Sequence, residues 1–198
     1  MMKTNAPAET AAADKKAELG DLPVWNLDDL YPGMESAEYK AALGEAEKNS
    51  IAFERNYRDK LAAVLNEGPE KLAEAIKAYE ALDDLLGRIM SYAGLIHAGD
   101  TSDHKIAKFF GDAQDKLTRI STKLLFFTLE FNKLDDEALE TAMQQSDALG
   151  HYRPWIEDIR REKPYQLDDK LEQLFFEKSV TGGGAFTRLF DETQASLR

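Results

Sequence analysis

The fold is decided by residues 69–99, which read PEKLAEAIKAYEALDDLLGRIMSYAGLIHAG. Pro69 is a favoured first residue of a helix, and Gly99 is a typical residue at a helix end. Between them, apolar residues recur every three or four positions, which is the spacing of one buried helix face. These residues are Leu72, Ile76, Tyr79, Leu82, Leu86, Ile89, Ala93 and Ile96. The stretch therefore predicts one long amphipathic helix.

The segment before this helix carries the same spacing. We expect a helix capped by Ser36 that runs unbroken to about Asn66, where Gly68 and Pro69 stop it. Its predicted buried face consists of Tyr39, Leu43, Ala46, Ser50, Phe53, Tyr57, Leu61 and Val64. The pattern indicates a second long helix that packs on the first.

A third long helix is expected after residue 99. Asp100 and Ser102 are both possible caps, and the helix should run to about Asn132. Its predicted face consists of Ile106, Phe109, Phe110, Ala113, Leu117, Ile120, Leu124 and Phe127. Because the turns between the three helices are short, the helices should be antiparallel neighbours.

Shorter helices are expected over the rest of the chain. Asp135 should cap one that Gly150 closes, and Pro154 should open another that Pro164 breaks. Asp168 should cap a third, interrupted by residues 181–184, after which residues 185–197 resume the helical pattern. The side chains of Leu171, Leu174 and Phe175 are expected to point inward, and the resumed pattern carries Phe186, Leu189, Phe190 and Leu197. The predicted class is all-α, an antiparallel long-helix bundle followed by shorter helices.

Composition excludes several classes of function. The net charge is −12, which disfavours binding to nucleic acid and to anionic membranes. The chain has no cysteine and no apolar run long enough to span a bilayer. Residues 1–20 are polar and predict a disordered leader, not a secretory signal. Residues 22–32 should form a strap that packs Trp25, Leu27, Leu30 and Tyr31 on the body. We expect a soluble, cytoplasmic protein.

The sequence holds no complete catalytic, cofactor or metal site. His97 and His104, with Asp100 and Asp103, could supply metal ligands, but a helix junction with capping carboxylates is the favoured interpretation. His151 stands alone and is interpreted as a structural or surface residue.

Two further patterns are interpreted in structural terms. The triplet Gly182-Gly183-Gly184 lacks the Lys and Ser or Thr of a phosphate loop and is interpreted as a helix breaker or hinge. The acidic groups Asp83-Asp84 and Asp135-Asp136-Glu137 are interpreted as solvated or capping residues.

Two stretches resemble a known family. Residues 23–31, PVWNLDDLY, are similar to the "W-x-L-x-x-L-Y" opening of the oligoendopeptidase F family. Residues 151–161, HYRPWIEDIRR, followed by residues 164–167, PYQL, and by Leu171-Glu172, resemble a later junction of that family. Tyr165 stands where the family often has His, and Asp168 where it often has Ser. The resemblance covers residues 22–198.

The resemblance implies a zinc metallopeptidase of the thimet-oligopeptidase type that cleaves oligopeptides. Residues 21–198 would be its helical N-terminal domain, which forms one wall of the substrate channel. The zinc motif His-Glu-x-x-His would lie in a later catalytic domain, and the helical pattern still running at Arg198 suggests a chain cut before it. The segment alone would bind no zinc and be inactive, with oligopeptides and its own C-terminal catalytic domain as partners. No catalytic, cofactor or metal residue is carried over.

One alternative is a self-contained helical interaction module without enzymatic activity, which dimerises through the face from Tyr39 to Val64. A helical metal-binding enzyme is less favoured, because the chain has no Glu-x-x-His pair.

Overall fold

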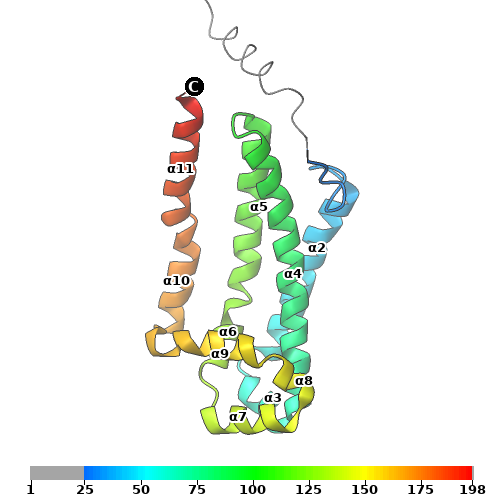
Figure 1. Ribbon diagram of the computed structural model, residues 1–198, viewed down its shortest axis with the longest axis vertical. Coiled ribbons are helices and arrows are strands. Elements are labelled where there is room, and N and C mark those ends of the chain that lie inside the picture. Colours follow the sequence, from blue (N-terminus) through cyan, green and yellow to red (C-terminus); the bar gives the residue numbers. More distant parts are fainter. Residues whose placement is uncertain (1–24, 198) are drawn as a thin grey trace, which may run out of the picture.

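The computed structural model describes residues 25–197, and within this range every regular element is a helix (Figure 1). The predicted all-α class is therefore confirmed. Three long elements form the body: α2 (Ala37–Tyr57), α4 (Pro69–Gly99) and α5 (His104–Thr122). The predicted leader, residues 1–20, lies outside the described range.

Shorter helices extend this body at one end and along one side. Those at the lower end in Figure 1 are α3 (Leu61–Glu67), α6 (Leu125–Phe131), α7 (Asp136–Gln145), α8 (Asp147–His151) and α9 (Arg153–Glu162). A 3-10 turn, η1 (Lys163–Tyr165), then leads into α10 (Asp169–Ser179) and α11 (Gly183–Ser196), which rise alongside α5 (Figure 1). Among the described residues, no helix combines the length and apolarity needed to cross a bilayer.

Helix α4 begins and ends where the sequence predicts, at Pro69 and Gly99. It packs on both α2 and α5, so its predicted apolar face forms the centre of the core. Burial of this face supplies the main stabilising term of the bundle. Among residues 25–197, the largest fully buried side chains are Tyr92, Phe127, Phe131, Leu61, Leu72, Ile76, Ile89, Leu139, Leu149, Ile156 and Ser50.

The first long helix is not continuous, and this prediction is wrong. The Ser36 hydroxyl does cap α2, accepting from the Tyr39 N–H. The helix nevertheless ends at Tyr57, and Asp59 takes a positive φ of 61°, which an α-helix does not allow. The Asp59 N–H that the break releases donates to the Glu130 carboxylate of α6 at 2.8 Å. A long-range bond thus stabilises the break.

The third long helix is also broken, at Lys123 and Leu124 between α5 and α6. The backbone N–H groups of both residues donate three positions back, which tightens the turn. The Thr122 hydroxyl donates to the Thr118 carbonyl, a type of bond that bends helices. The cap of α5 is Asp103, which accepts from the N–H groups of Lys105 and Ile106.

Asp100 and Ser102, the predicted caps of α5, serve the preceding turn instead. The Asp100 carboxylate accepts from the Ser102 hydroxyl and from the backbone N–H groups of Ser102 and Asp103. The bond from the Ser102 hydroxyl is the main reason why the pKa of Asp100 is lowered. The carboxylate that holds the turn is therefore not the one that caps the helix.

Asp135 caps α7 as predicted, but Gly150 does not close that helix. The chain leaves α7 at Ser146, whose hydroxyl accepts from the Leu149 N–H and so caps α8. Ser146 is buried, and its hydroxyl donates to the Glu70 carboxylate at the start of α4. A second cap therefore divides the segment that the sequence presents as one helix, and Gly150 lies inside α8.

The described part of the N-terminal strap, residues 25–32, packs on the body largely as predicted, and residues 22–24 lie outside the described range. Tyr31 is buried, and Leu27 and Leu30 pack against the core. Arg88 of α4 donates to the Leu30 carbonyl, and its guanidinium lies 5.6 Å from the centre of the Tyr31 ring. Trp25 is 85% exposed, so the predicted packing of its ring on the body is wrong. The turn that begins at Leu27 anchors the strap, and Trp25 precedes this turn.

The Glu130 carboxylate makes stability depend on pH. Burial is the largest cause that raises the pKa of Glu130, against the lowering effect of the Asp59 N–H. The pKa of Glu130 is higher in the folded protein than in the unfolded chain. The contribution of Glu130 to stability is therefore complete at pH values below its pKa in the unfolded chain, and it is lost as the pH rises through its pKa in the folded protein. Glu130→Gln keeps an acceptor for Asp59 without the buried charge.

We therefore expect the Glu130→Gln variant to be more stable than the parent at pH 7. Its advantage should shrink as the pH falls below the ordinary glutamate range. Urea unfolding at both pH values measures this difference, with Glu137→Gln, on the exposed surface of α7, as the control. An advantage of equal size at both pH values would contradict the role of the buried charge.

Candidate functional site

The candidate metal ligands lie at the turn between α4 and α5, and the structure gives them other roles. The His97 ring stacks on Phe110, with ring centres 4.6 Å apart and planes inclined by 12°. Asp100 and Asp103 hold the turn and cap α5, as described above. The interpretation as a helix junction is therefore confirmed.

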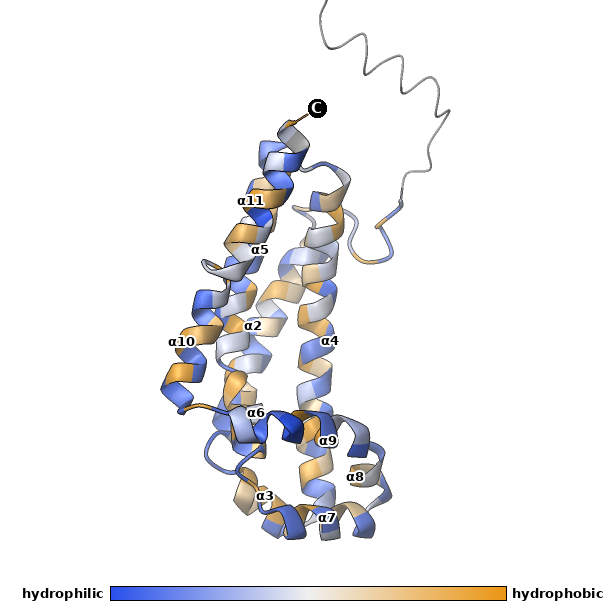
Figure 2. Ribbon diagram, turned by 60° about the vertical axis from the view of Figure 1, so that its left-hand side comes forward, coloured by the Kyte–Doolittle hydropathy of each residue, from blue (hydrophilic) through white to orange (hydrophobic). Residues whose placement is uncertain are grey.

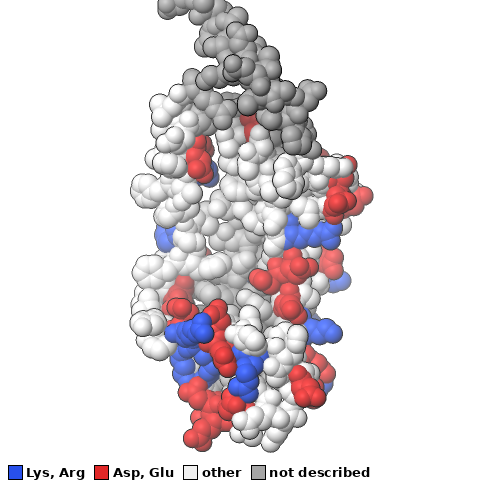
Figure 3. Space-filling model, viewed as in Figure 1, with Lys and Arg blue, Asp and Glu red and all other residues white. Residues whose placement is uncertain are grey.

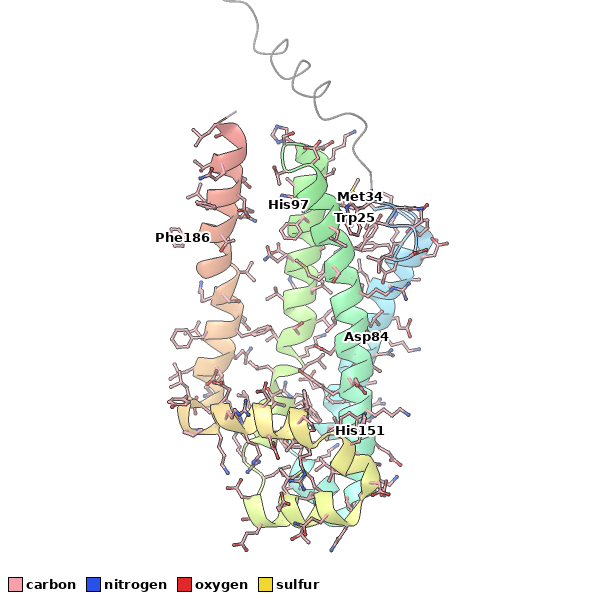
Figure 4. All side chains as sticks on the ribbon, viewed as in Figure 1. Trp25, Met34, Asp84, His97, His151 and Phe186 are labelled. Atoms are coloured by element: carbon pink, nitrogen blue, oxygen red, sulfur yellow. The ribbon has the colours of Figure 1, made fainter. Side chains whose placement is uncertain are left out.

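Elsewhere in residues 25–197, no three or more His, Asp or Glu side chains lie close enough together to hold a metal ion. His151 is exposed at the end of α8 and lies against the edge of the Tyr152 ring (Figure 4). Its interpretation as a surface residue is confirmed.

The glycine triplet and the acidic groups also have structural roles. Gly182 lies between α10 and α11, and a Cβ atom added there would lie 2.9 Å from the Lys178 carbonyl oxygen. Asp83 and Asp84 are exposed on α4, and the Asp135 carboxylate accepts from the Ala138 N–H. The interpretation of these acidic residues as solvated or capping groups is confirmed.

The stretch 151–161 ties the lower helices together. The Tyr152 hydroxyl donates to Glu80 of α4 at 2.9 Å, and Arg153 makes a two-pronged ion pair with Glu140 of α7 at 2.8 and 3.0 Å. This ion pair is the largest cause of the lowered pKa of Glu140. The Trp155 ring packs against the aromatic side chains of α4 and α6. The stretch therefore holds α8 and α9 against α4, α6 and α7.

Arg160, in the same stretch, holds the end of α6. Its guanidinium donates to the carbonyls of Phe131 and Leu134, each at 2.9 Å, and pairs with Asp136. The hydrogen bond from Arg160 is the largest cause of the lowered pKa of Asp136. The Arg160 side chain is only 14% exposed, so its hydrogen bonds to the two carbonyls are shielded from water.

A groove of about 300 Å³ runs between α2 and α5. Leu43, Gly44 and Glu47 line it from α2, and four residues line it on the other side. These are Lys116, Arg119 and Ile120 of α5 and Lys123, which directly follows α5. Three of these four side chains are cationic, in a protein whose net charge is −12. We name these three the cationic ridge.

The cationic ridge was not singled out from the sequence. Its members, Lys116, Arg119 and Lys123, are three and four positions apart, which places them on one face of a helix. That spacing is a signal in the sequence, but lysines and arginines at such positions usually lie on solvated helix faces. Their gathering beside α2 is visible only after the fold is known. Arg119 and Lys123 also line a second groove, together with Asp115 of α5 and Glu177 of α10.

A row of exposed apolar side chains marks the arm formed by α10 and α11. The row comprises Leu171, Leu174, Phe175, Phe186, Leu189, Phe190 and Leu197, and each of them is at least 45% exposed. The prediction that Leu171, Leu174 and Phe175 point inward is wrong. Helix α10 packs on α5 and α6, and Phe176 is its half-buried apolar side chain.

The figures show how this row lies on the surface. Apolar colouring recurs along both helices in Figure 2, and Phe186, which is 74% exposed, points away from α5 in Figure 4. The edge formed by these helices is mostly free of charged side chains in Figure 3, whereas the lower end carries both signs. Contiguous apolar surface of this kind marks an interaction site. We name this row the apolar face.

Comparisons with known proteins find similarity to one group of peptidases. The family model described as "Oligopeptidase F" (Peptidase_M3_N) matches residues 130–198. Oligopeptidase PepF of Bacillus subtilis (strain 168) is 25% identical over 185 residues, which is 89% of this chain and 26% of that protein. The fold is similar to the crystal structure of oligoendopeptidase-F from Enterococcus faecium, with a TM-score of 0.61 and 19% identity.

The matches cover most of this chain but only a small share of each relative. The likeness to the Enterococcus faecium structure covers 73% of this chain and 28% of that one. The chain thus spans about a quarter of the length of the relatives that it matches. The family model thus matches the C-terminal part of this chain, the Bacillus subtilis oligopeptidase is similar in sequence to most of it, and the Enterococcus faecium structure has a similar fold.

Proposed function

We propose that this chain is the N-terminal helical part of a larger zinc metalloendopeptidase that hydrolyses oligopeptides. Its long helices would form one wall of the channel through which the peptide reaches the catalytic domain. The matched family and the Bacillus subtilis relative are oligopeptidases by name, which supports the peptide as substrate class. A cytoplasmic location stays a prediction.

The observation that carries the proposal is the position of the apolar face. All of its residues lie between Leu171 and Leu197, inside the segment 130–198 that the family model matches. Aromatic and aliphatic side chains exposed in a row are stabilised when a partner surface removes them from water. In the proposed enzyme, the catalytic domain is that partner.

The residues described here do not fit a zinc site, because no group of three or more potential ligands is present among them. The sequence also has no His-Glu-x-x-His motif. Zinc would therefore be bound by the catalytic domain, and this chain would contribute the surface that admits and orients the peptide.

The alternative, a dimerising helical module, is not favoured by the packing. It needs the face from Tyr39 to Val64 to be free for a second copy. In the structure, Tyr39, Phe53 and Leu61 of that face are buried within the bundle. Dimerisation through it would require the core to open.

The proposed function predicts where peptidase activity resides. We expect the coding sequence after codon 198 to continue into a domain with His-Glu-x-x-His and a later Glu. The protein that includes this domain should cleave a quenched fluorescent oligopeptide in the presence of zinc, and the chain of residues 1–198 should not. A stop codon after Arg198, or zinc-dependent cleavage by residues 1–198 alone, would contradict the proposal.

A further inference from the structure

The groove between α2 and α5 has the chemical features of a site for a peptide terminus. Leu43 and Ile120 supply apolar surface, and the cationic ridge supplies positive charge beside it. Its volume of about 300 Å³ lies at the lower end of the range of sites that hold small ligands. We propose that this groove binds the free C-terminal carboxylate of an oligopeptide, with the last apolar side chain against Leu43 and Ile120. The proposal takes the class of ligand from the proposed function.

The charges of the groove favour an anion. Lys116, Arg119 and Lys123 face one carboxylate in the groove lining, that of Glu47. Outside this groove, Glu35 and Asp112 lie beside Lys116, and Asp115 and Glu177 lie beside Arg119 and Lys123. Within residues 25–197, none of the three cations forms an ion pair within 4.0 Å of a carboxylate. Lysine and arginine bind carboxylates through charge-assisted hydrogen bonds, which are stronger than neutral ones.

The overall charge indicates that the anion is small. A net charge of −12 repels nucleic acid, acidic proteins and a second copy of this chain over the whole surface. At physiological ionic strength, charges interact strongly only within about 8 Å. A peptide terminus that enters the groove is therefore attracted by the cationic ridge, and a peptide without acidic side chains is not repelled by the rest of the surface.

Gly44 leaves the α2 side of the groove open. A Cβ atom added at Gly44 would meet nothing within 4 Å. Glycine inside a helix destabilises it relative to alanine, and the packing of this chain gives no reason for glycine at this position. A bare backbone beside Leu43 allows a ligand to approach α2 closely.

The experiment compares two peptides by NMR titration of the 198-residue chain. The probes are Ac-Ala-Ala-Ala-Ala-Leu with a free C-terminal carboxylate and the same peptide with a C-terminal amide. We expect the free acid to bind about tenfold more tightly or better, which corresponds to the loss of one charge-assisted hydrogen bond. The amide signals that move should be those of residues 43–47 and 116–123, and binding should weaken as salt is added.

Variants separate the groove from general charge effects. Arg119→Gln and Lys123→Gln should each weaken binding of the free acid. Lys77→Gln, on the exposed surface of α4, makes the same charge change outside the groove and should bind as the parent does. Gly44→Phe should abolish binding by filling the groove, whereas Gly44→Ala should retain it. Circular dichroism confirms that each variant is folded.

Equal affinity for the acid and the amide, or equal binding by Arg119→Gln and the parent, would overturn the proposal. So would failure of both peptides to bind. None of these results depends on peptidase activity, so they are distinguishable from failure of the proposed function. If a longer protein cleaves peptides but this groove binds none, only the groove assignment is wrong.

Discussion

Replacing Phe127 with alanine is expected to lower the free energy of unfolding by about 3–5 kcal/mol. Phe127 is 0% exposed, and its ring centre lies 5.1 Å from that of Phe53 and 4.8 Å from that of Tyr79. The ring therefore connects α6 with α2 and α4. Its removal leaves a cavity that the surrounding helices close only in part, so the loss exceeds the transfer free energy of the ring.

The apolar face provides the matched control for this variant. Phe186→Ala makes the same chemical change at an exposed position. It should change the free energy of unfolding by no more than about 0.5 kcal/mol. Urea unfolding followed by circular dichroism measures both variants. If the two variants were equally destabilised, the assignment of Phe127 to the core would be wrong.

The second large effect is expected at Arg160. Arg160→Ala should lower the free energy of unfolding by about 3 kcal/mol, because two carbonyls near the end of α6 lose a charged donor that is shielded from water. The distances of 2.9 Å to the Phe131 and Leu134 carbonyls show that both bonds are formed. Thermal and urea unfolding at pH 7 measure the loss.

The neighbouring arginine is a control with the same chemistry. The Arg161 side chain is 75% exposed and pairs only with Asp158 on its own helix. Exposed pairs of this kind contribute little, so Arg161→Ala should stay within about 0.5 kcal/mol of the parent. A larger loss for Arg161→Ala than for Arg160→Ala would contradict the role given to Arg160.

Much of the fold could be predicted because its limits are set by local chemistry. Pro69 and Gly99 mark the ends of α4, and Ser36, Asp135 and Asp168 cap helices where the sequence indicates. Each of these signals acts within one turn of the chain. The family resemblance was likewise carried by short stretches, and the comparisons agree with it.

The errors arose where distant residues decide the structure. The break at Asp59 is stabilised by Glu130, which lies 71 positions further along the chain, so no local pattern announces it. Helix α10 carries apolar residues on more than one side, and periodicity does not tell which side is covered. Phe176 proved to be the less exposed residue, and its neighbour Phe175 points outward.

The candidate groove could not be predicted for a related reason. The cationic ridge can be placed on one helix face from its spacing, but the wall opposite comes from α2, about 70 residues earlier in the chain. Sequence spacing describes one helix at a time. The volume between two helices depends on which of their faces meet, and this is a property of the folded bundle.

The two helix breaks have a mechanical consequence. The chain is interrupted between α2 and α3 and again between α5 and α6, whereas α4 runs through its 31 residues without a break. At 1.5 Å per residue, α4 is a rod of roughly 45 Å. It reaches from the turn at Asp100 to the contacts with α7 and α8 at the opposite end. Because α4 has no break, it sets the distance between the two ends of the molecule, and the two breaks are the places at which the neighbouring helices change direction.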